Sequence, residues 1–317
     1  DAALAQIPDG QSKQDGIAVG AEAAAAMIAA RDGDGSFPPQ FFPPPPPAPG
    51  VWQATPNCSP AGGVFYHVRN VRPFGLDSGD QFRSGPPPAI TSSRYTRDYR
   101  ESKLLGRFDS PYRPQDRSDV ARYYAAVLGV QTWNPAVRQV AAVADHTITY
   151  NARALALVNM AVVDGLIAVM DAKYTYVWWR PETAIKNGDN DTNPRTEGDP
   201  LWAPFINVPC HPDYPSAHAV LAGGARELAE RFYGGGGHSI TLQHTLVPGI
   251  VLHYTRFRDI AKDIDDARIY GGVHVRYDQE EGARLGKKVG LHLYRHVLRR
   301  TDDVAEEEGV SGTDSRE

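Results

Sequence analysis

The sequence is poor in cysteine, has no long apolar run and carries no excess of positive charge. Its 317 residues include two cysteines, too few for the disulfide framework that supports small secreted domains. Cys58 and Cys210 could form one bridge, but their separation along the chain gives no geometric support for it. Two free thiols are an equal alternative.

Other absences narrow the class of protein. No stretch of about 18 uninterrupted apolar residues occurs, so we expect no membrane span. The formal net charge is −5, which argues against the basic field that attracts nucleic acid. The chain begins at Asp1 rather than methionine, and we expect export to the periplasm or the medium after removal of a signal peptide. The oligomeric state stays open, with a homodimer as one option.

The N-terminal 115 residues predict an irregular arm that packs on a later core. The alanine-rich stretch Ala21–Ala30 favours a helix that packs closely on a neighbour. The proline run Pro43–Pro47 favours an extended polyproline segment. We interpret it as a stiff connector laid over the surface, with an SH3-type ligand as the alternative. Residues 51–115 are rich in Gly, Pro, Ser and Arg and indicate irregular structure.

Residues 116–300 predict a helical core, and residues 301–317 an acidic, disordered tail. The strongest helix, Ala154–Lys173, is apolar on nearly every face, so we expect it at the centre. Asp164 lies inside this run. A buried carboxylate needs a cation or several donors, and we expect an ion pair near the functional site, with a position at the rim as the alternative.

Further helices complete a mainly α fold. Near the C-terminus, glycine recurs every four residues at 282, 286 and 290, a stripe that allows close approach of another helix. The additional helices are expected over 118–143 with breaks at Gly129 and Pro135, over 216–233, over 255–270, and from Asp278 onward.

Three separated segments concentrate basic and histidine residues in this acidic chain. Their spacings, K-x₆-R-P, P-S-x-H and R-x₅-H-x₃-D, form an ordered set that is improbable by chance. Each segment offers groups that bind an anion or move a proton. The segments are Lys173 with Arg180 and Pro181, then Pro215 to His218, then Arg268 with His274 and Asp278.

The Pro215 segment predicts the start of a helix. Ser216 is a favourable N-cap residue, which places Ala217 and His218 in the first turn. Free backbone N–H groups and the positive end of the helix dipole suit a phosphate-like anion there. His218 can serve as a general acid or base. Alone, the segment is also typical of an ordinary helix cap with a surface histidine.

The other two segments supply cations and a second histidine. Lys173 closes the long helix, where a cation also compensates the dipole, whereas Arg180 precedes a proline that enforces extended backbone. Arginine binds an oxyanion in bidentate fashion and lysine acts as a point charge. Asp278 follows His274 by four residues and can fix its tautomer, leaving one ring nitrogen as nucleophile or ligand. A surface ion pair is the alternative there. The combined set suits a pentacoordinate oxyanion.

This ordered set resembles the active-site signature of vanadium-dependent haloperoxidases and type 2 phosphatidic acid phosphatases. The motifs span residues 173–278, within helical context from about 117 to 299. The resemblance implies a helical bundle that binds vanadate, or phosphate, without haem or flavin. It implies that His274 bonds vanadium or attacks phosphorus and that His218 is the acid–base residue. The implied ligands of the equatorial oxygens are Lys173, Arg180, Ser216, the backbone N–H of Ala217, and Arg268.

Nearby residues distinguish branches of this superfamily. The family usually has glycine at the position of Ala217, and phosphatases often have serine at that of Ala267. Algal bromoperoxidases similarly carry a histidine seven positions before the acid–base histidine, where the fungal chloroperoxidase type has phenylalanine. His211 therefore favours bromide over chloride. The stretch Trp178-Trp179-Arg180-Pro181 looks more like haloperoxidases, with Trp178 expected near the substrate.

Three functions follow from the pattern. The first is a vanadate-dependent haloperoxidase that oxidises halide with hydrogen peroxide and modifies a small organic substrate. The second is an acid phosphatase that hydrolyses a phosphate ester through a phosphohistidine at His274. The third is a non-catalytic protein that binds phosphate and docks a partner through Pro43–Pro47.

Overall fold

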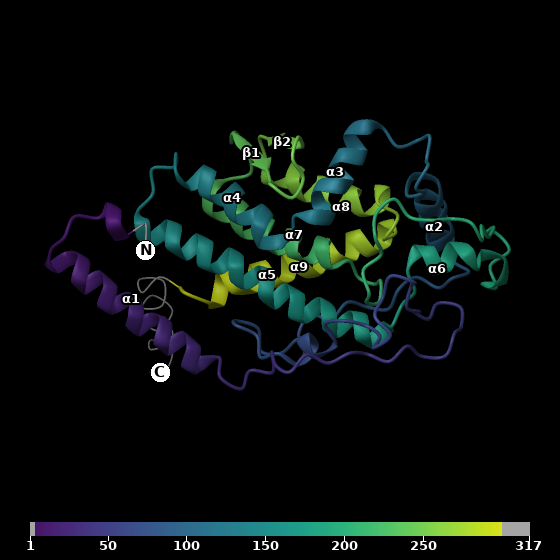
Figure 1. Ribbon diagram of the computed structural model, residues 1–317, viewed down its shortest axis with the longest axis horizontal. Helices are drawn as coiled ribbons and strands as arrows, with labels where there is room; N and C mark the ends of the chain where they lie inside the picture. Colours follow the sequence, from purple (N-terminus) through teal and green to yellow (C-terminus); the bar gives the residue numbers. More distant parts are fainter. Residues whose placement is uncertain (1–3, 300–317) are drawn as a thin grey trace, which may run out of the picture.

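The computed structural model describes residues 4–299, so the tail predicted at 301–317 lies outside the described residues. The expected mainly α fold is confirmed (Figure 1). The α-helices are α1 (Gln11–Ala30), α2 (Ser93–Leu105), α3 (Gln115–Ala126), α4 (Gly129–Ala141), α5 (Ile148–Tyr176), α6 (Pro181–Lys186), α7 (Ala217–Tyr233), α8 (Phe257–Tyr270) and α9 (Arg276–His296). Short 3₁₀ turns lie at Leu4–Gln6, Tyr66–Asn70 and Gly188–Asn190, and one antiparallel hairpin joins β1 (Ile240–Gln243) to β2 (Val251–Tyr254).

Helix α5 runs through the centre of the bundle (Figure 1). The Thr147 side chain caps its start by accepting the N–H of Tyr150, and Val177 ends it in the left-handed region. The helix is long and apolar enough to cross a membrane by length and composition, but 67% of its most apolar window is buried inside the protein. The core helix of a globular protein meets the same criteria.

The glycine stripe of α9 packs against α7, as its spacing predicts. A Cβ atom at Gly282 would lie 2.6 Å from the carbonyl oxygen of Ser216, and one at Gly290 would lie 2.7 Å from that of Gly224. At Gly286 an added methyl group would overlap the carbonyl oxygen of Val220. The two backbones are therefore in direct contact, and this fixes the start of α7 beside the start of α9.

The ion pair predicted for Asp164 is wrong. Its fully buried carboxylate accepts the backbone N–H groups of Phe74, Gly75 and Leu76 at 2.7, 2.8 and 3.1 Å. A buried carboxylate can be stabilised by a cation or by several hydrogen-bond donors. At Asp164 the three backbone donors take the place of a cation. Burial nevertheless raises the pKa of Asp164. This residue thus ties the N-terminal arm to the central helix.

The N-terminal arm follows the lower edge of the bundle in Figure 1. Pro43–Pro47 lies outside any helix or strand, and the Gln53 side chain donates to the carbonyl of Pro45 at 2.9 Å. The helix predicted at Ala21–Ala30 exists within α1, but the expected close packing is wrong. No residue of α1 is buried, and the helix stands apart from the bundle.

Some local predictions need correction. A break does separate α3 from α4 immediately before Gly129, but Pro135 lies inside α4 and does not break it. Helix α2 falls within the region expected to be irregular, where the Ser92 side chain caps it and Tyr95 and Tyr99 are buried. The β1–β2 hairpin was not predicted, and α9 starts two residues before Asp278.

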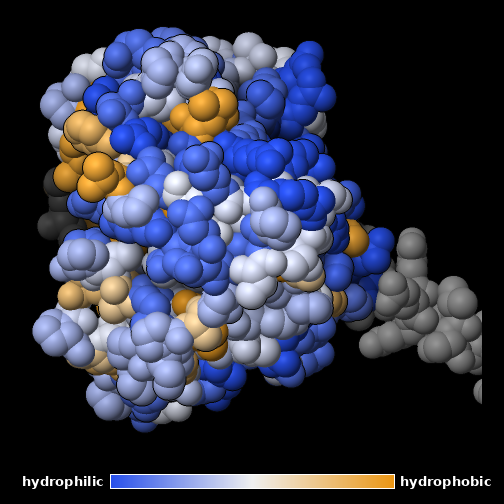
Figure 2. Space-filling model, turned by 90° about the vertical axis from the view of Figure 1, so that its right-hand side faces the viewer, coloured by the Kyte–Doolittle hydropathy of each residue, from blue (hydrophilic) through white to orange (hydrophobic). Residues whose placement is uncertain are grey.

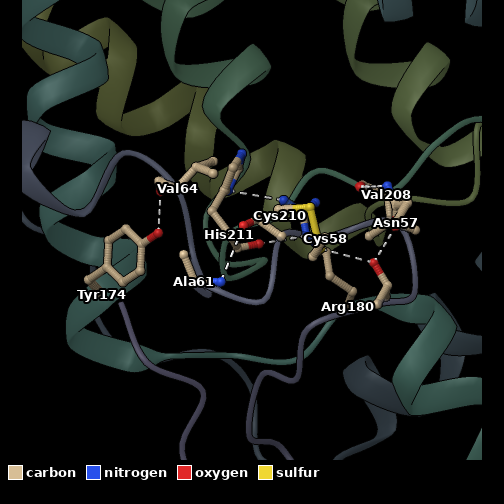
Figure 3. Close-up of a disulfide and its surroundings, with 11 residues drawn as sticks. Asn57, Cys58, Ala61, Val64, Tyr174, Arg180, Val208, Cys210 and His211 are labelled. Atoms are coloured by element: carbon tan, nitrogen blue, oxygen red, sulfur yellow. Dashed lines mark hydrogen bonds between the residues drawn. A yellow bond between two sulfur atoms is a disulfide. The ribbon is translucent and has the colours of Figure 1, made fainter. Parts of the chain in front are cut away.

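Cys58 and Cys210 form a disulfide with Cα atoms 5.4 Å apart (Figure 3). Sequence separation gave no reason to prefer this pairing over free thiols. The bridge joins the arm to the loop that precedes α7, next to His211 and Arg180. The end of the molecule that carries α2 and α6 is mainly hydrophilic, with small separate apolar patches (Figure 2).

Candidate active site

The three predicted segments meet where α5, α6, α7 and α9 come together. Lys173 lies in the last turn of α5 and is completely buried. Its ammonium donates to the carbonyl of Pro212 at 2.9 Å and to that of Asp213. Burial and then the charge of Arg180 lower the pKa of Lys173 well below its ordinary value. The lysine therefore links the end of α5 to the loop before α7.

Arg180 is the N-cap residue of α6, with extended backbone before Pro181, as the sequence predicts. Its buried guanidinium points inward but is already held by protein acceptors. Nε donates to the carbonyl of His211 at 3.0 Å, and Nη1 donates to Asp213 Oδ1 at 2.9 Å and to the carbonyl of Val273 at 2.8 Å. An ion pair with Asp213 thus occupies much of its hydrogen-bonding capacity.

The N-terminus of α7 has the predicted form. Ser216 is the N-cap, and its hydroxyl accepts the N–H of Ala219 at 3.4 Å. The N–H of Ser216 donates to the carbonyl of Asp278, which joins the starts of α7 and α9. The first N–H groups of a helix have no partner within the helix. Those of Ala217 and His218 are therefore free to meet an anion.

His218 and Arg268 each carry buried side-chain nitrogens that lack a hydrogen-bond partner. His218 Nε2 is buried without one, as are Nε and Nη1 of Arg268 at the end of α8. Burial, followed by the charge of Arg268, lowers the pKa of His218 well below its ordinary value, so this imidazole is neutral. Burial and the Arg180 charge lower the pKa of Arg268 to about 9. Orphaned polar atoms of this kind fit a polar ligand.

His274 has its two ring nitrogens in opposite environments. Nδ1 lies 2.6 Å from Asp213 Oδ1 and 3.1 Å from Asp278 Oδ2, whereas Nε2 lies 3.1 Å from Nη1 of Arg180. Two carboxylates require the proton on Nδ1, and a guanidinium donor requires a lone pair on Nε2. Burial lowers the pKa of His274 well below its usual range. The neutral ring therefore directs a nucleophilic or ligating nitrogen toward the cations.

The two carboxyl groups share the negative charge of this cluster unequally. Burial raises the pKa of both, and the pKa of Asp278 is raised well above its ordinary value because Asp213 adds to burial. Asp213 also faces the guanidinium of Arg180 at 2.9 Å, a charge that opposes the effect of burial on its pKa. Although Asp213, His274 and Asp278 have ligand atoms within 4.8 Å of one another, the guanidinium of Arg180 already supplies the positive charge there.

A cavity of about 920 Å³ leads to this cluster. His218, Arg268 and His274 line one end together with Ala217 and His211. The remaining wall is largely apolar and comes from α3, α4, α5, α7 and the segment before Cys210. Lys173, Arg180 and Ser216 lie behind the lining residues.

Comparisons with known proteins agree with this geometry. Residues 153–303 match the family model of the VCPO second helical-bundle domain. A segment of 94 residues is 34% identical to vanadium chloroperoxidase from Curvularia inaequalis, covering 26% of this chain and 15% of that protein. Over this region the chain is similar to vanadium haloperoxidases, which lie within the superfamily that includes type 2 phosphatidic acid phosphatases.

Solved haloperoxidase structures share the fold. The first bacterial vanadium-dependent iodoperoxidase has a TM-score of 0.75 at 24% identity, over 90% of this chain and 70% of that chain. A holo-type bacterial vanadium-dependent chloroperoxidase has a TM-score of 0.67 at 15% identity, over 84% and 69% of the two chains. These identities establish the haloperoxidase architecture without transferring an activity.

The structure gathers nearly all the predicted residues, with one exception. Trp178 does not line the cavity. Its indole N–H donates to the hydroxyl of Tyr277 at 2.8 Å, and its ring packs on Gly50. The structure thus places Trp178 outside the cavity that His218 and His274 line. His211 does line the cavity, with Nδ1 3.1 Å from Nη2 of Arg180.

Asp213 is the functional-site residue that the sequence reasoning missed. It stands in the same string as His211 and Ser216 but has no place in the three spacings. Only the fold shows that its carboxylate contacts both Arg180 and His274. One sequence feature could have indicated Asp213. It is an acidic residue two positions before Pro215, in a loop that otherwise consists of apolar and aromatic residues and His211.

Proposed function

We propose that this protein is a vanadate-dependent haloperoxidase that oxidises halide with hydrogen peroxide. The main support is the arrangement of unpartnered donors on Arg268, neutral His218 and the His274 Nε2 lone pair around one buried cationic pocket. Three cations outnumber the two carboxyl groups of the cluster, so the pocket favours an anion.

The residues fit vanadate. His274 Nε2 would bond the central atom, while Arg268 and the first N–H groups of α7 would bind its oxygens. Lys173 and Arg180 would contribute mainly charge because protein acceptors hold their donors. When bound, vanadate supplies a Lewis acid that makes hydrogen peroxide electrophilic toward halide. No haem or flavin is required for this chemistry.

Proton movement in this proposal belongs to His218. Its neutral imidazole can accept a proton from incoming hydrogen peroxide and return it to a leaving oxygen. Asp278 and Asp213 keep the proton of His274 on Nδ1, so Nε2 keeps the lone pair that faces Nη1 of Arg180. The two histidines therefore have separate roles, set by their different partners.

We propose bromide as the preferred halide. The relatives are named for chloride and iodide oxidation, so the family does not select a halide. His211 lines the cavity between Arg180 and the ring of Phe65, whose centroid is 6.4 Å from its own. Its imidazole adds a polar contact at the position expected for halide approach. The disulfide supports the further proposal of export to an oxidising compartment.

The test is a paired assay on protein loaded with vanadate. We expect peroxide-dependent bromination of an indicator dye, with metal analysis showing about one vanadium per chain. His274→Ala should lose both bound vanadium and activity. Inactivity with bromide, chloride and iodide would overturn the proposal. Hydrolysis of p-nitrophenyl phosphate with phosphate trapped on His274 would instead establish the phosphatase, and phosphate binding without turnover would establish the non-catalytic alternative.

A further inference from the structure

The cavity beside the site is much larger and more apolar than peroxide and halide require. Its volume of about 920 Å³ lies at the upper end of the range for small-molecule pockets. His218, Arg268 and His274 line the cavity together with Arg122, Thr132 and Asn207, while Val127, Leu128, Trp133, Leu166 and Leu221 contribute to its apolar wall. We call this wall the apolar chamber. Apolar surface left in water is unfavourable, so an apolar molecule would bind there favourably.

One side of the chamber is closed by a firmly held piece of the arm. The N–H of Val64 donates to the carbonyl of Cys210 at 2.8 Å, and the hydroxyl of Tyr174 donates to the carbonyl of Val64. The neighbouring disulfide anchors the same segment (Figure 3). Val64, Cys210 and Phe65 all line the chamber, so this wall is a built part of the cavity.

Phe65 has an unfavourable backbone conformation at this wall. Its φ of 62° lies in the left-handed region, which bulky residues rarely adopt. The hydrogen-bonded Val64 before Phe65 and the 3₁₀ turn Tyr66–Asn70 after it hold this conformation. The aromatic ring is 48% exposed and lies against His211. Strain of this kind is commonly maintained at ligand-binding positions, here beside the polar end of the chamber.

We propose that the apolar chamber binds the apolar body of an organic substrate and presents its reacting carbon to the end formed by His218 and His274. The proposal rests on the proposed function for its chemistry, in which hydrogen peroxide, bromide, a proton and R–H give R–Br and two waters. The C–H bond is replaced by C–Br, peroxide is reduced and bromide is oxidised.

The residues of the chamber give a second reason for a bound substrate. Met170, Tyr124 and Trp133 line the cavity and carry oxidisable side chains. A halogenating oxidant released into an empty chamber would reach them before bulk solvent. A substrate bound against the same wall would intercept the oxidant. The apolar part of the lining suits the neutral ring of an aromatic or alkene-bearing molecule.

A competition assay tests the proposal. A naphthol and a sulfonated naphthol are offered together, and the product ratio is compared with that from reagent hypobromite. We expect wild type to favour the neutral naphthol by roughly tenfold, because burying a sulfonate against the apolar wall is unfavourable. Ala126→Phe adds bulk to the chamber wall and should return the ratio to the reagent value, whereas Val143→Phe introduces the same side chain at an 87% exposed position and should not.

Two further measurements separate this proposal from the proposed function. Iodide oxidation to triiodide needs no organic acceptor, so Ala126→Phe should retain it. Binding of the neutral probe N-phenylnaphthylamine to protein without vanadate reports the chamber alone, and Ala126→Phe should weaken it about tenfold. If halides are not oxidised but this binding pattern holds, the apolar site stands while the proposed function fails. Equal product ratios in wild type and reagent, or probe binding unaffected by Ala126→Phe, would overturn the chamber proposal.

Discussion

At the scale of single residues, the site is defined by which donors are already occupied. Arg180 and Lys173 are satisfied by the protein, whereas Arg268 and His218 keep atoms without partners. These four residues all belong to the predicted motif, but they differ in the number of nitrogen atoms that remain without a protein partner and can bind a ligand. The difference comes from Asp213 and from the carbonyl groups of the loop before α7.

Asp213→Asn should strengthen anion binding. The substitution removes a negative charge within the pocket but retains an acceptor for Nδ1 of His274. A nearby charge in a partly screened site is worth about 1–2 kcal/mol, so we expect roughly tenfold tighter binding of inorganic phosphate or vanadate by calorimetry. Asp263→Asn, which removes a carboxylate paired with Arg117, is the matched control. Unchanged or weaker binding by the Asp213 variant would show that anchoring Arg180 outweighs the charge.

At the scale of elements, the close contact of α7 and α9 positions both histidine-bearing helix starts. Ser216 donates to the carbonyl of Asp278 across this contact. The approach requires glycine in this stripe because the atoms opposite it are mostly backbone atoms of α7. Backbone atoms cannot move aside to make room for a Cβ, as a flexible side chain can. Helix packing and site geometry therefore depend on the same glycines.

Gly286→Ala should destabilise the fold by about 1–3 kcal/mol through overpacking. Its methyl group would overlap the Val220 carbonyl and lie 2.8 Å from the Gly224 nitrogen. Thermal unfolding should show a lower midpoint. Gly20→Ala is the matched control because an added Cβ in exposed α1 meets nothing within 4 Å, and helix propensity favours alanine there. Equal midpoints for the two variants would contradict close packing of α7 on α9.

Much of this element-level arrangement could be predicted from sequence. The apolar periodicity of α5, the Ser216 cap and the glycine stripe are local patterns with one physical meaning. Asp213 and the apolar chamber could not be predicted because they depend on which loops and helices meet in space. Helix α2 was missed because its polar sequence becomes helical with Tyr95 and Tyr99 buried against later elements.

At the scale of the whole molecule, the N-terminal arm is part of the site's construction. It reaches the bundle through Asp164, through Val64 and through the disulfide at Cys210. The pairing of the two cysteines lies beyond sequence reasoning because 152 positions separate them. The arm brings Phe65 to the chamber, so removing it should alter more than stability.

Cys210→Ser should lower the thermal midpoint under non-reducing conditions. Loop closure over 152 positions predicts a loss of about 3–5 kcal/mol. A reductant should bring wild type to the midpoint of the variant and leave the variant unchanged, which provides the internal control. Identical midpoints for both proteins without reductant would show that the bridge contributes nothing to the folded state.

The same bridge changes what a single backbone cut can do. Residues 58 to 210 form a covalently closed ring that contains Lys173 and Arg180, whereas His218, Arg268 and His274 lie outside it. A protease acting once within the ring leaves two fragments still joined, so both halves of the site stay on one covalent assembly. A cut between Cys210 and His218 separates the cations of α5 and α6 from both histidines. Nicking inside the ring should therefore be visible only after reduction.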